Sequence, residues 1–557
     1  MSLKPTSTLA VPTMTAEVAR AAFPQGNPYL CLRDELGLIF NDTDFADLFP
    51  TRGQPGLPPW RLALVTVLQF RENLSARQAA DAVRARIDWK YLLGLELTDA
   101  GFDFSVLSEF RTRLVEAEAS DRLLNPLLQV CQVQGLLQAR GRQRTDATHV
   151  LTAVRALNRL ELVAKTLRAT LNVIATLEPV WLKGHVPDEW YKRYGRRIEY
   201  RRRPSSEAER QEKAQQIGED GTLLLDWLAM PETPAALKEL PEVDILKAVW
   251  QRHYQRHQTN DDNPDKENLC WRVNQELAKD QDTIKTPYDV EARYRNKNGL
   301  TWLGYNVHLS ETCDAETPHL VTQVMTTPAN VGDAKCTAAI QQALVDQAIP
   351  PAIHLADASY IAGDLLVKSQ SQHKITLVGP VRDSARWQHH VEGAYALDQF
   401  TFDWDNQTAY CPQGQASTLW YPFDKDNGYA YIRVVFDKKD CSPCAERARC
   451  TRAKDTSRPR SLQLQPQPQQ EAIHRMRTYL NSDEGKQLYN QRAGIEGTLA
   501  QGIRRCGLRQ SRYVGLAKTH LQQVATAAAI NLDRLVNWFE HRPRAKTRVS
   551  RFAALAA

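Results

Sequence analysis

Three acidic residues occupy segments that a metal-dependent enzyme could use. Asp146 lies inside an alternating, β-branched stretch that is typical of a strand, and Asp357 ends a short apolar run. Glu496 follows Tyr489 and Arg492 at spacings that put all three on one face of a helix. Carboxylates that converge from distant segments can hold two divalent ions about 4 Å apart, as phosphodiester cleavage requires. Taken singly, each acid is better explained as a helix cap or a solvent-facing side chain.

Four cysteines form a second candidate site, for a metal of another kind. Cys441 and Cys444 make a Cys-x2-Cys pair, Cys450 follows them, and Cys411 lies upstream, close to Gly414. Four thiolates suit tetrahedral Zn²⁺, and the prolines and the glycine suit tight metal-binding turns. The wide gap between Cys411 and Cys441 leaves open the alternative of a small folded insertion with buried thiols.

Basic residues are concentrated in three runs. They comprise Lys192, Arg193, Arg196, Arg197, Arg201, Arg202 and Arg203 around one acid, Glu199; then Arg504, Arg505, Arg509, Arg512 and Lys518; and finally Arg542, Arg544, Lys546, Arg548 and Arg551. A single run is best explained as a solvated face or a loose tail. Three runs in a chain of net charge +6 favour a polyanionic partner.

The bulk composition excludes several classes of protein. With 557 residues, 42% of them hydrophobic and 24% charged, we expect a soluble chain of two to four domains. No apolar stretch is long enough to span a membrane, and the first twenty residues lack the features of a secretory signal. An intracellular, reducing location is therefore expected, in which the ten cysteines serve as thiols or metal ligands rather than disulfides.

The elements that must position these residues can be traced in the hydrophobic pattern. Apolar residues recur at helical spacing from Pro58 onwards, and the sequence 74–78 indicates a cap followed by a second helix. Further along, the pattern predicts strands over 144–154, 302–310, 320–327, 352–357 and 375–381, and a helix over 334–347. This order predicts an α/β layer of the ribonuclease-H-like type, interrupted by insertions.

The expected domains follow from these elements. We predict a poorly defined arm over 1–55, a helical DNA-binding domain of the helix-turn-helix sort over 56–140, an α/β ribonuclease-H-like core built from 141–155, 281–390 and 471–540, a helical basic insertion over 156–280, a Cys-rich insertion over 391–470 and a basic tail over 541–557. For the helical N-terminal domain, a dimerisation or packing module is an equally good explanation.

The Tyr-x2-Arg-x3-Glu arrangement ending at Glu496 resembles the signature of bacterial insertion-sequence DDE transposases. Further segments resemble one subgroup of that family: Arg144-Thr-Asp-Ala-Thr-His-Val150, 287–294, 302–313, 357–360 and 513–518. Together they cover most of the chain from about Gly56 to Phe539, in family order. One departure concerns a lysine that the family often has seven positions after the glutamate, because this chain has Ile503 there, with Arg504 next to it.

The resemblance implies a ribonuclease-H-like catalytic core in which Asp146, Asp357 and Glu496 hold two Mg²⁺ ions, with Mn²⁺ as a substitute. Water would free a 3′-hydroxyl at each transposon end, and that hydroxyl would then attack target DNA. The DNA-contacting candidates are Tyr489, Arg492, Arg504, Arg505, Lys518, Arg196, Arg197 and Arg201. Asp289 and Glu291 are the reserve acids.

The same resemblance implies double-stranded DNA as partner, a homodimer that pairs two ends, and a nucleoid-associated place in a bacterial cytoplasm. Two alternatives remain open. The chain could be a transposase-derived DNA-binding protein that no longer cuts, or a nuclease of the same fold that never joins strands. An intact acidic triad favours the enzyme.

Overall fold

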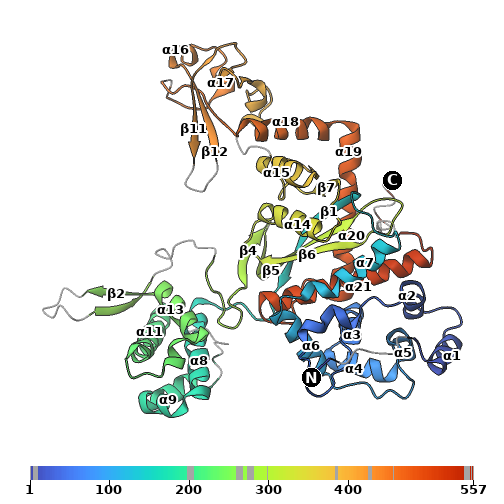
Figure 1. The fold of residues 1–557 in the computed structure, drawn as a ribbon. Helices are drawn as coiled ribbons and strands as arrows, with labels where there is room; N and C mark the ends of the chain where they lie inside the picture. Colours follow the sequence, from blue (N-terminus) through green and yellow to red (C-terminus); the bar gives the residue numbers. More distant parts are fainter. Residues whose placement is uncertain are drawn as a thin grey trace.

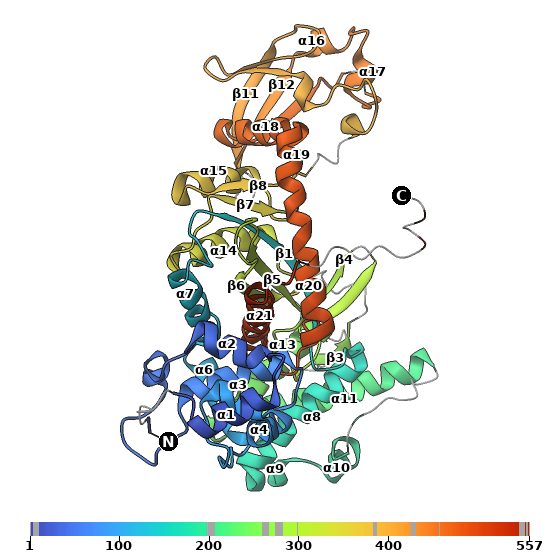
Figure 2. The same cartoon turned by 90° about the vertical axis from the view of Figure 1, so that its right-hand side faces the viewer.

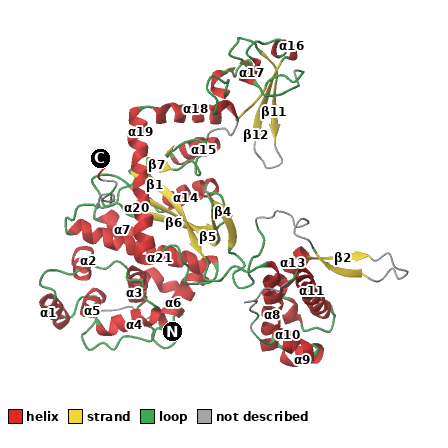
Figure 3. Ribbon diagram, turned by 180° about the vertical axis from the view of Figure 1, so that it is seen from behind, coloured by secondary structure: helices red, strands yellow, loops and turns green. Residues whose placement is uncertain are grey.

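The computed structural model describes residues 2–3, 10–196, 198, 206–258, 267–272, 282–297, 299–382, 387–424, 430–455, 457–544, 552 and 555. A mixed sheet lies at the centre, with an N-terminal helical domain against it and two lobes that project from it (Figure 1). One lobe is mostly helical, and the other is built largely of strands (Figure 3). None of the helices in the described ranges combines the length and the apolar character that a bilayer-spanning segment requires.

The central sheet has six strands in the order β4-β5-β1-β7-β8, with β6 paired to β5 off this path. Their bounds are Arg142–Leu151 for β1, Arg293–Lys297 for β4, Leu300–Thr312 for β5, Val321–Pro328 for β6, Ile353–Ala356 for β7 and Thr376–Val378 for β8. β1 runs antiparallel to β5 and parallel to β7, and β7 runs parallel to β8. Nearly all of β5 is buried, which indicates that protein covers both faces of the sheet.

Three helices complete the layers around this sheet. α14 (Ala334–Asp346) connects β6 to β7, and α15 (Gly363–His373) connects β7 to β8. α21 (Leu516–Phe539) packs on β6 and on α3, so it lies between the sheet and the N-terminal helical domain (Figure 2). The Asn531 amide fixes this contact, since its Oδ1 accepts from the Val321 N–H at 2.7 Å and its Nδ2 donates to the Val321 carbonyl at 2.8 Å.

The N-terminal helical domain begins earlier than expected. Its elements are α1 (Thr13–Ala22), α2 (Pro28–Leu36), η1 (Asp42–Leu48), α3 (Pro59–Arg71), α4 (Ala76–Ala85), α5 (Ile87–Leu93), α6 (Ser105–Glu116), η2 (Ser120–Leu123) and α7 (Asn125–Val133). The expectation of a poorly defined arm over 1–55 is therefore wrong for residues 13–48. Short segments with weak periodicity are ordered there because Tyr29, Leu32 and Phe45 enter the main core.

A helix cap fixes the start of α4, and an ion pair links the helical domain to α21. Ser75 caps α4 with a reciprocal capping box to Gln78, as the pattern predicts. A buried ion pair of 2.8 Å joins Arg71 Nε to Asp533 Oδ1 on α21. The helical domain is thus fixed to the sheet domain through a shared helix.

The helical lobe is the green body in Figure 1. It contains α8 (Arg159–Leu177), α9 (Pro179–His185), α10 (Asp188–Tyr194), α11 (Glu207–Ala229), α12 (Ala235–Lys238) and α13 (Pro241–His253), followed by β2 (Tyr254–Gln258) and β3 (Glu267–Trp271). It has a hydrophobic core of its own. Gly221 on α11 lets the Trp250 ring approach, because a Cβ there would lie 2.0 Å from that ring.

Acid is expected to destabilise this lobe through His253. The buried imidazole accepts from Arg159 Nε at 3.0 Å and stacks on Trp271. Burial, reinforced by the charge of Arg159, lowers the pKa of His253 to about 3. Because this pKa is lower in the folded than in the unfolded protein, acid protonates the unfolded protein preferentially. The free energy of unfolding is therefore at its full value above about pH 6.5, and it falls by about 1.4 kcal/mol per pH unit as the pH drops toward the folded pKa.

Urea unfolding followed by tryptophan fluorescence between pH 6.5 and 4.5 measures this loss. The variant His253→Gln, which cannot titrate, is expected to show a shallower dependence on pH. Equal slopes for the variant and the unmodified chain would contradict the prediction.

The second lobe holds the cysteine cluster. It contains η3 (Trp387–His389), η4 (Leu397–Gln399), β9 (Thr401–Asp403), β10 (Thr408–Tyr410), β11 (Ser417–Asp424), β12 (Ala430–Phe436), α16 (Lys438–Cys441), α17 (Arg447–Cys450) and β13 (Ser461–Leu464). β12 pairs with both β11 and β13 in antiparallel fashion. Helix α18 (Gln467–Asn481) leads from this lobe back to the sheet domain (Figure 1).

Candidate active site

Two of the three candidate acids lie on neighbouring parallel strands. The register of β1 and β7 pairs Thr145 with Ala356, so the next residues along, Asp146 and Asp357, come side by side. Asp146 Oδ1 accepts from the Ala147 N–H at 2.7 Å, and Asp357 Oδ1 accepts from the Ser359 N–H at 2.7 Å. The strand that ends before Asp357 thus delivers its carboxylate beside Asp146, in the middle of β1.

The electrostatics of Asp146 reflect both its burial and the nearby charge of Asp357. The Asp146 side chain is 15% exposed. Burial raises the pKa of Asp146 to about 6, Arg492 opposes this rise, and the nearby charge of Asp357 adds to it. A carboxylate with a raised pKa beside a second acid is typical of sites that bind cations or move protons.

The third acid lies on a long, irregular helix that runs past the sheet (Figure 2). Its segments are α19 (Asp483–Asn490), η5 (Gln491–Ala493), α20 (Gly494–Gln501) and the π-helical η6 (Gly502–Cys506). Arg492 Nη2 lies 2.6 Å from Asp146 Oδ2, and Arg492 Nη1 lies 3.5 Å from Glu496 Oε1. One guanidinium therefore bridges the strand acid and the helix acid, while the Glu496 side chain remains 67% exposed.

Tyr489 belongs to the same neighbourhood. Its side chain is half-buried, and burial raises its pKa. Arg492 opposes the rise, whereas Asp357 and Asp146 add to it. Tyr489 and Arg492 thus lie close to the strand acids, and Glu496 is linked to Asp146 through the Arg492 guanidinium.

A buried ionic cluster holds the motif helix against the sheet. Glu311, on β5, has no exposed surface; its Oε1 lies 2.7 Å from the Arg144 guanidinium and its Oε2 lies 2.6 Å from Arg534 Nη1. Thr498 on α20 donates to the same carboxylate at 2.5 Å. Burial alone would raise the pKa of Glu311, but Arg534 and Arg144 hold it below its ordinary value. Arg144 also donates to the Gln491 carbonyl, directly before Arg492.

Sequence reasoning assigned no role to other residues near the acids. The charge of Lys297, at the end of β4, lowers the pKa of Asp146, and its Nζ lies 3.4 Å from Asp333 Oδ2. Tyr360 is buried below the acids, and its hydroxyl lies 2.6 Å from His308 Nδ1. Tyr360 falls within a segment that resembles the family, whereas no sequence signal distinguishes Lys297 from other lysines.

The reserve acids lie elsewhere. Asp289 accepts hydrogen bonds from the hydroxyls of Tyr305 and Thr152. Glu291 Oε2 accepts from the Leu516 N–H at 2.7 Å, at the start of α21. Both acids are engaged in fixing segments of the fold.

Several DNA-contact candidates make contacts within the protein. Arg505 Nη1 pairs with Asp533 Oδ2 at 2.9 Å. Arg504 is exposed and donates only locally, from Nε to the Ala500 carbonyl at 3.2 Å, while Ile503 packs on the core. Lys518 is exposed on α21 and Arg196 is exposed after α10. Arg197 and Arg201 lie outside the described residues.

Other members of the basic runs are also engaged internally. Arg509 Nε donates to Thr148 Oγ1 at 2.9 Å, and Arg512 Nη1 donates to the Leu74 carbonyl at 2.5 Å. Arg544 Nη2, from the expected basic tail, donates to the Ala315 carbonyl at 2.9 Å. Some of the basic residues that the sequence pattern assigns to a polyanionic partner therefore make contacts within the fold.

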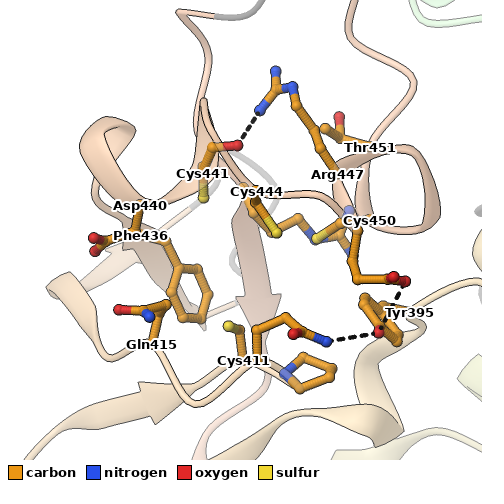
Figure 4. Close-up of a pocket in the computed structure, with 14 residues that line it drawn as sticks. Tyr395, Cys411, Gln415, Phe436, Asp440, Cys441, Cys444, Arg447, Cys450 and Thr451 are labelled. Atoms are coloured by element: carbon orange, nitrogen blue, oxygen red, sulfur yellow. Dashed lines mark hydrogen bonds between the residues drawn. The ribbon is translucent and has the colours of Figure 1, made fainter.

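The four cysteines gather around one cavity of about 40 Å³ in the second lobe (Figure 4). Cys411 approaches from the β-strand side and Cys441, Cys444 and Cys450 from the helical side. Within the described ranges, no set of three or more Cys, His, Asp or Glu side chains has a ready-made metal-holding arrangement. This applies equally to the cysteines and to the three acids.

The donor chemistry of the acidic site nevertheless fits a hard divalent cation. Asp146, Asp357 and Glu496 offer only oxygen ligands, which Mg²⁺ prefers. The cationic guanidinium of Arg492 already lies between Asp146 and Glu496, so this position accommodates positive charge.

Two family models match parts of the chain. A transposase DDE domain matches residues 410–536, which include Arg492, Glu496 and most of α21, and a transposase domain (DUF772) matches residues 17–113, from α1 to α6. No curated protein matches the chain. A DDE domain implies a ribonuclease-H-like fold, and the mixed α/β architecture is consistent with it. The two matched domains, in this order on one chain, support a DDE transposase of an insertion sequence.

Proposed function

We propose that the protein binds the terminal inverted repeats of its own insertion sequence and catalyses Mg²⁺-dependent cleavage and strand transfer with Asp146, Asp357 and Glu496. The observation that carries the proposal is the pairing of β1 with β7, which brings two aspartates together opposite the helix of Arg492 and Glu496. In this proposal the helical lobe and the cysteine-bearing lobe are insertions into a ribonuclease-H-like core.

The three carboxylates would hold a pair of Mg²⁺ ions, for which Mn²⁺ can substitute. When bound, the ions supply Lewis-acid polarisation of the phosphodiester and of the attacking oxygen. Arg492 would then move from its bridge between the acids to a phosphate oxygen, since a guanidinium makes bidentate contacts with phosphate. Lys297 would add positive charge beside Asp146.

The DNA partner is proposed to be duplex DNA, both transposon ends and target. Tyr489, Arg504, Lys518 and Arg196 are exposed or half-exposed and are available to contact it. Arg505 would contribute through its remaining exposed surface, because its side chain is 51% exposed despite the Asp533 pair. A homodimer would hold two ends together.

The deciding experiment incubates the purified protein with Mg²⁺ and DNA that carries the ends flanking its gene. Mapping of 3′-ends at the element boundary scores cleavage, and joined products score strand transfer. Cleavage without joined product would favour the nuclease alternative. Specific end binding with neither reaction would favour the DNA-binding alternative.

Arg492 should be needed for the chemical step more than for DNA binding. The variant Arg492→Ala leaves Asp146 without its cationic partner and removes one phosphate contact, so we expect single-turnover cleavage about 100-fold slower. Arg492→Lys is expected to rescue little, because an ammonium cannot bridge two groups as a planar fork does. The matched control is Arg475→Ala, which removes an arginine that is 68% exposed on α18. An unchanged cleavage rate in Arg492→Ala would remove this role.

A further inference from the structure

The cysteine cavity of the second lobe takes no part in the chemistry proposed above. Its sulfur-bearing side chains come from three separate segments: the turn after β10, the stretch from α16 to Cys444, and the end of α17. Figure 4 shows them around a common space, together with Tyr395 and Phe436. A volume of about 40 Å³ exceeds the roughly 10–15 Å³ that one water-sized sphere needs.

The backbone at these cysteines forms tight turns. At the first turn, the Gly414 N–H donates to the Cys411 carbonyl at 2.8 Å and the Cys411 N–H donates to the Gln415 carbonyl at 2.9 Å. Gly414 has φ of +78°, a conformation that favours glycine. A second turn forms where the Arg447 N–H donates to the Cys444 carbonyl at 3.1 Å. These turns hold the Cys411 and Cys444 side chains at the wall of the cavity. Structural metal sites require thiols that are fixed in this way.

The charges around the cavity suit an anionic metal centre. One Zn²⁺ with four thiolates carries a net charge of about −2. Arg447 and Arg460 line the same cavity. Their positive charges would offset the negative charge of such a centre.

The hydrophobic core of this lobe is small. Among the described residues, its fully buried apolar side chains are Tyr395, Phe400, Ala409, Val434, Phe436, Leu462 and Leu464, and partly buried ones, including Cys411, Cys441 and Cys450, pack against them. Small units with so small a core usually need a disulfide or a metal. All ten cysteines of the chain are free thiols, including the four at this cavity.

We propose that Cys411, Cys441, Cys444 and Cys450 bind one structural Zn²⁺ that ties the strand layer of this lobe to α16 and α17. The four side chains do not yet form a ready-made ligand set, so binding draws the sulfurs inward into the cavity. Soft thiolates select Zn²⁺ over the hard cation proposed for the acidic site. This inference does not depend on the chain being an active transposase.

The test uses the full chain, purified with a reducing agent and without chelator. Elemental analysis is expected to find one zinc per chain, and Co²⁺ exchanged into the site is expected to give the visible absorption of a tetrahedral tetrathiolate. Cys411→Ser and Cys444→Ser should each lose the bound zinc. The matched control Cys31→Ser, which removes a half-buried thiol on α2, should retain it.

A second measurement does not rely on any variant folding. Extraction of zinc from the unmodified protein by a strong chelator should expose residues 387–465 to protease while the sheet domain stays intact. Any of four results would overturn the inference: reduced protein without stoichiometric zinc, zinc retained in both serine variants, iron in its place, or disulfides among the four cysteines.

Discussion

Replacing Asp146 or Asp357 by asparagine, or Glu496 by glutamine, is expected to slow Mg²⁺-dependent cleavage of transposon ends at least about 1000-fold, or about 4 kcal/mol in activation free energy. Each substitution keeps the size of the side chain but removes the negative charge that a divalent ion requires. Asp146 and Asp357 come together through strand pairing, and Glu496 joins them through Arg492. Loss of any one of them should therefore damage the same site.

End binding separates this effect from misfolding. The three variants should bind transposon-end DNA nearly as well as the unmodified chain, because the proposed DNA contacts lie mainly on other residues. Asp483→Asn is the matched control, since this acid begins the same helical run but its side chain is 98% exposed and pairs with Lys486. Cleavage retained in all three variants would exclude the assignment, and cleavage lost in Asp483→Asn would make it uninformative.

The strands around the acids could be predicted from sequence because their side chains alternate or are uniformly apolar. The predicted stretches 144–154 and 352–357 overlap β1 and β7 closely. An acid directly after a buried strand must lie at the strand's carboxyl edge, which predicts the position of Asp357. Asp146 lies inside β1, so its closeness to Asp357 depends on the pairing of β1 with β7, which the pattern does not specify. Arg492 and Glu496 are four residues apart, and this helical spacing predicts that their side chains are neighbours, as the structure shows.

The contacts that complete the site could not be predicted in this way. Arg492 and Asp146 are 346 positions apart in the chain, and no pattern in one segment specifies a partner in the other. The roles of Arg505, Arg509 and Arg512 are similar cases, because a count of basic residues cannot distinguish an arginine that faces DNA from one that pairs internally. The helices within residues 13–48 could not be predicted, because short helices that share a core show little hydrophobic periodicity of their own.

Glu311 links the motif helix to the sheet. Its carboxylate, with no exposed surface, neutralises Arg144 from β1 and Arg534 from α21 and accepts from Thr498 on α20. Gly494 permits the close approach of Arg144, since a Cβ there would lie 2.2 Å from Arg144 Nη1. A single buried carboxylate therefore joins the strand that carries Asp146 to the helix that carries Glu496.

The variant Glu311→Gln is expected to lose about 3–5 kcal/mol of the free energy of unfolding of the sheet domain, because it leaves the buried Arg144 and the partly buried Arg534 without this counter-charge. Urea unfolding at neutral pH measures the loss. The double variant Glu311→Gln with Arg534→Met should be destabilised by less than the sum of the single variants, since removing both partners leaves fewer uncompensated charges. The exposed Glu316→Gln, in the loop after β5, is the matched control.

Cleavage by Glu311→Gln distinguishes a positioning role from a purely structural one. If the cluster sets the distance between Glu496 and the strand acids, folded Glu311→Gln should require more Mg²⁺ for half-maximal cleavage, and its affinity for end DNA should remain near that of the unmodified chain. A merely structural role would lower the amount of folded protein without changing the Mg²⁺ dependence of the folded fraction. An unfolding free energy and a Mg²⁺ dependence that both match the unmodified chain would show that Arg144 and Arg534 do not need this carboxylate.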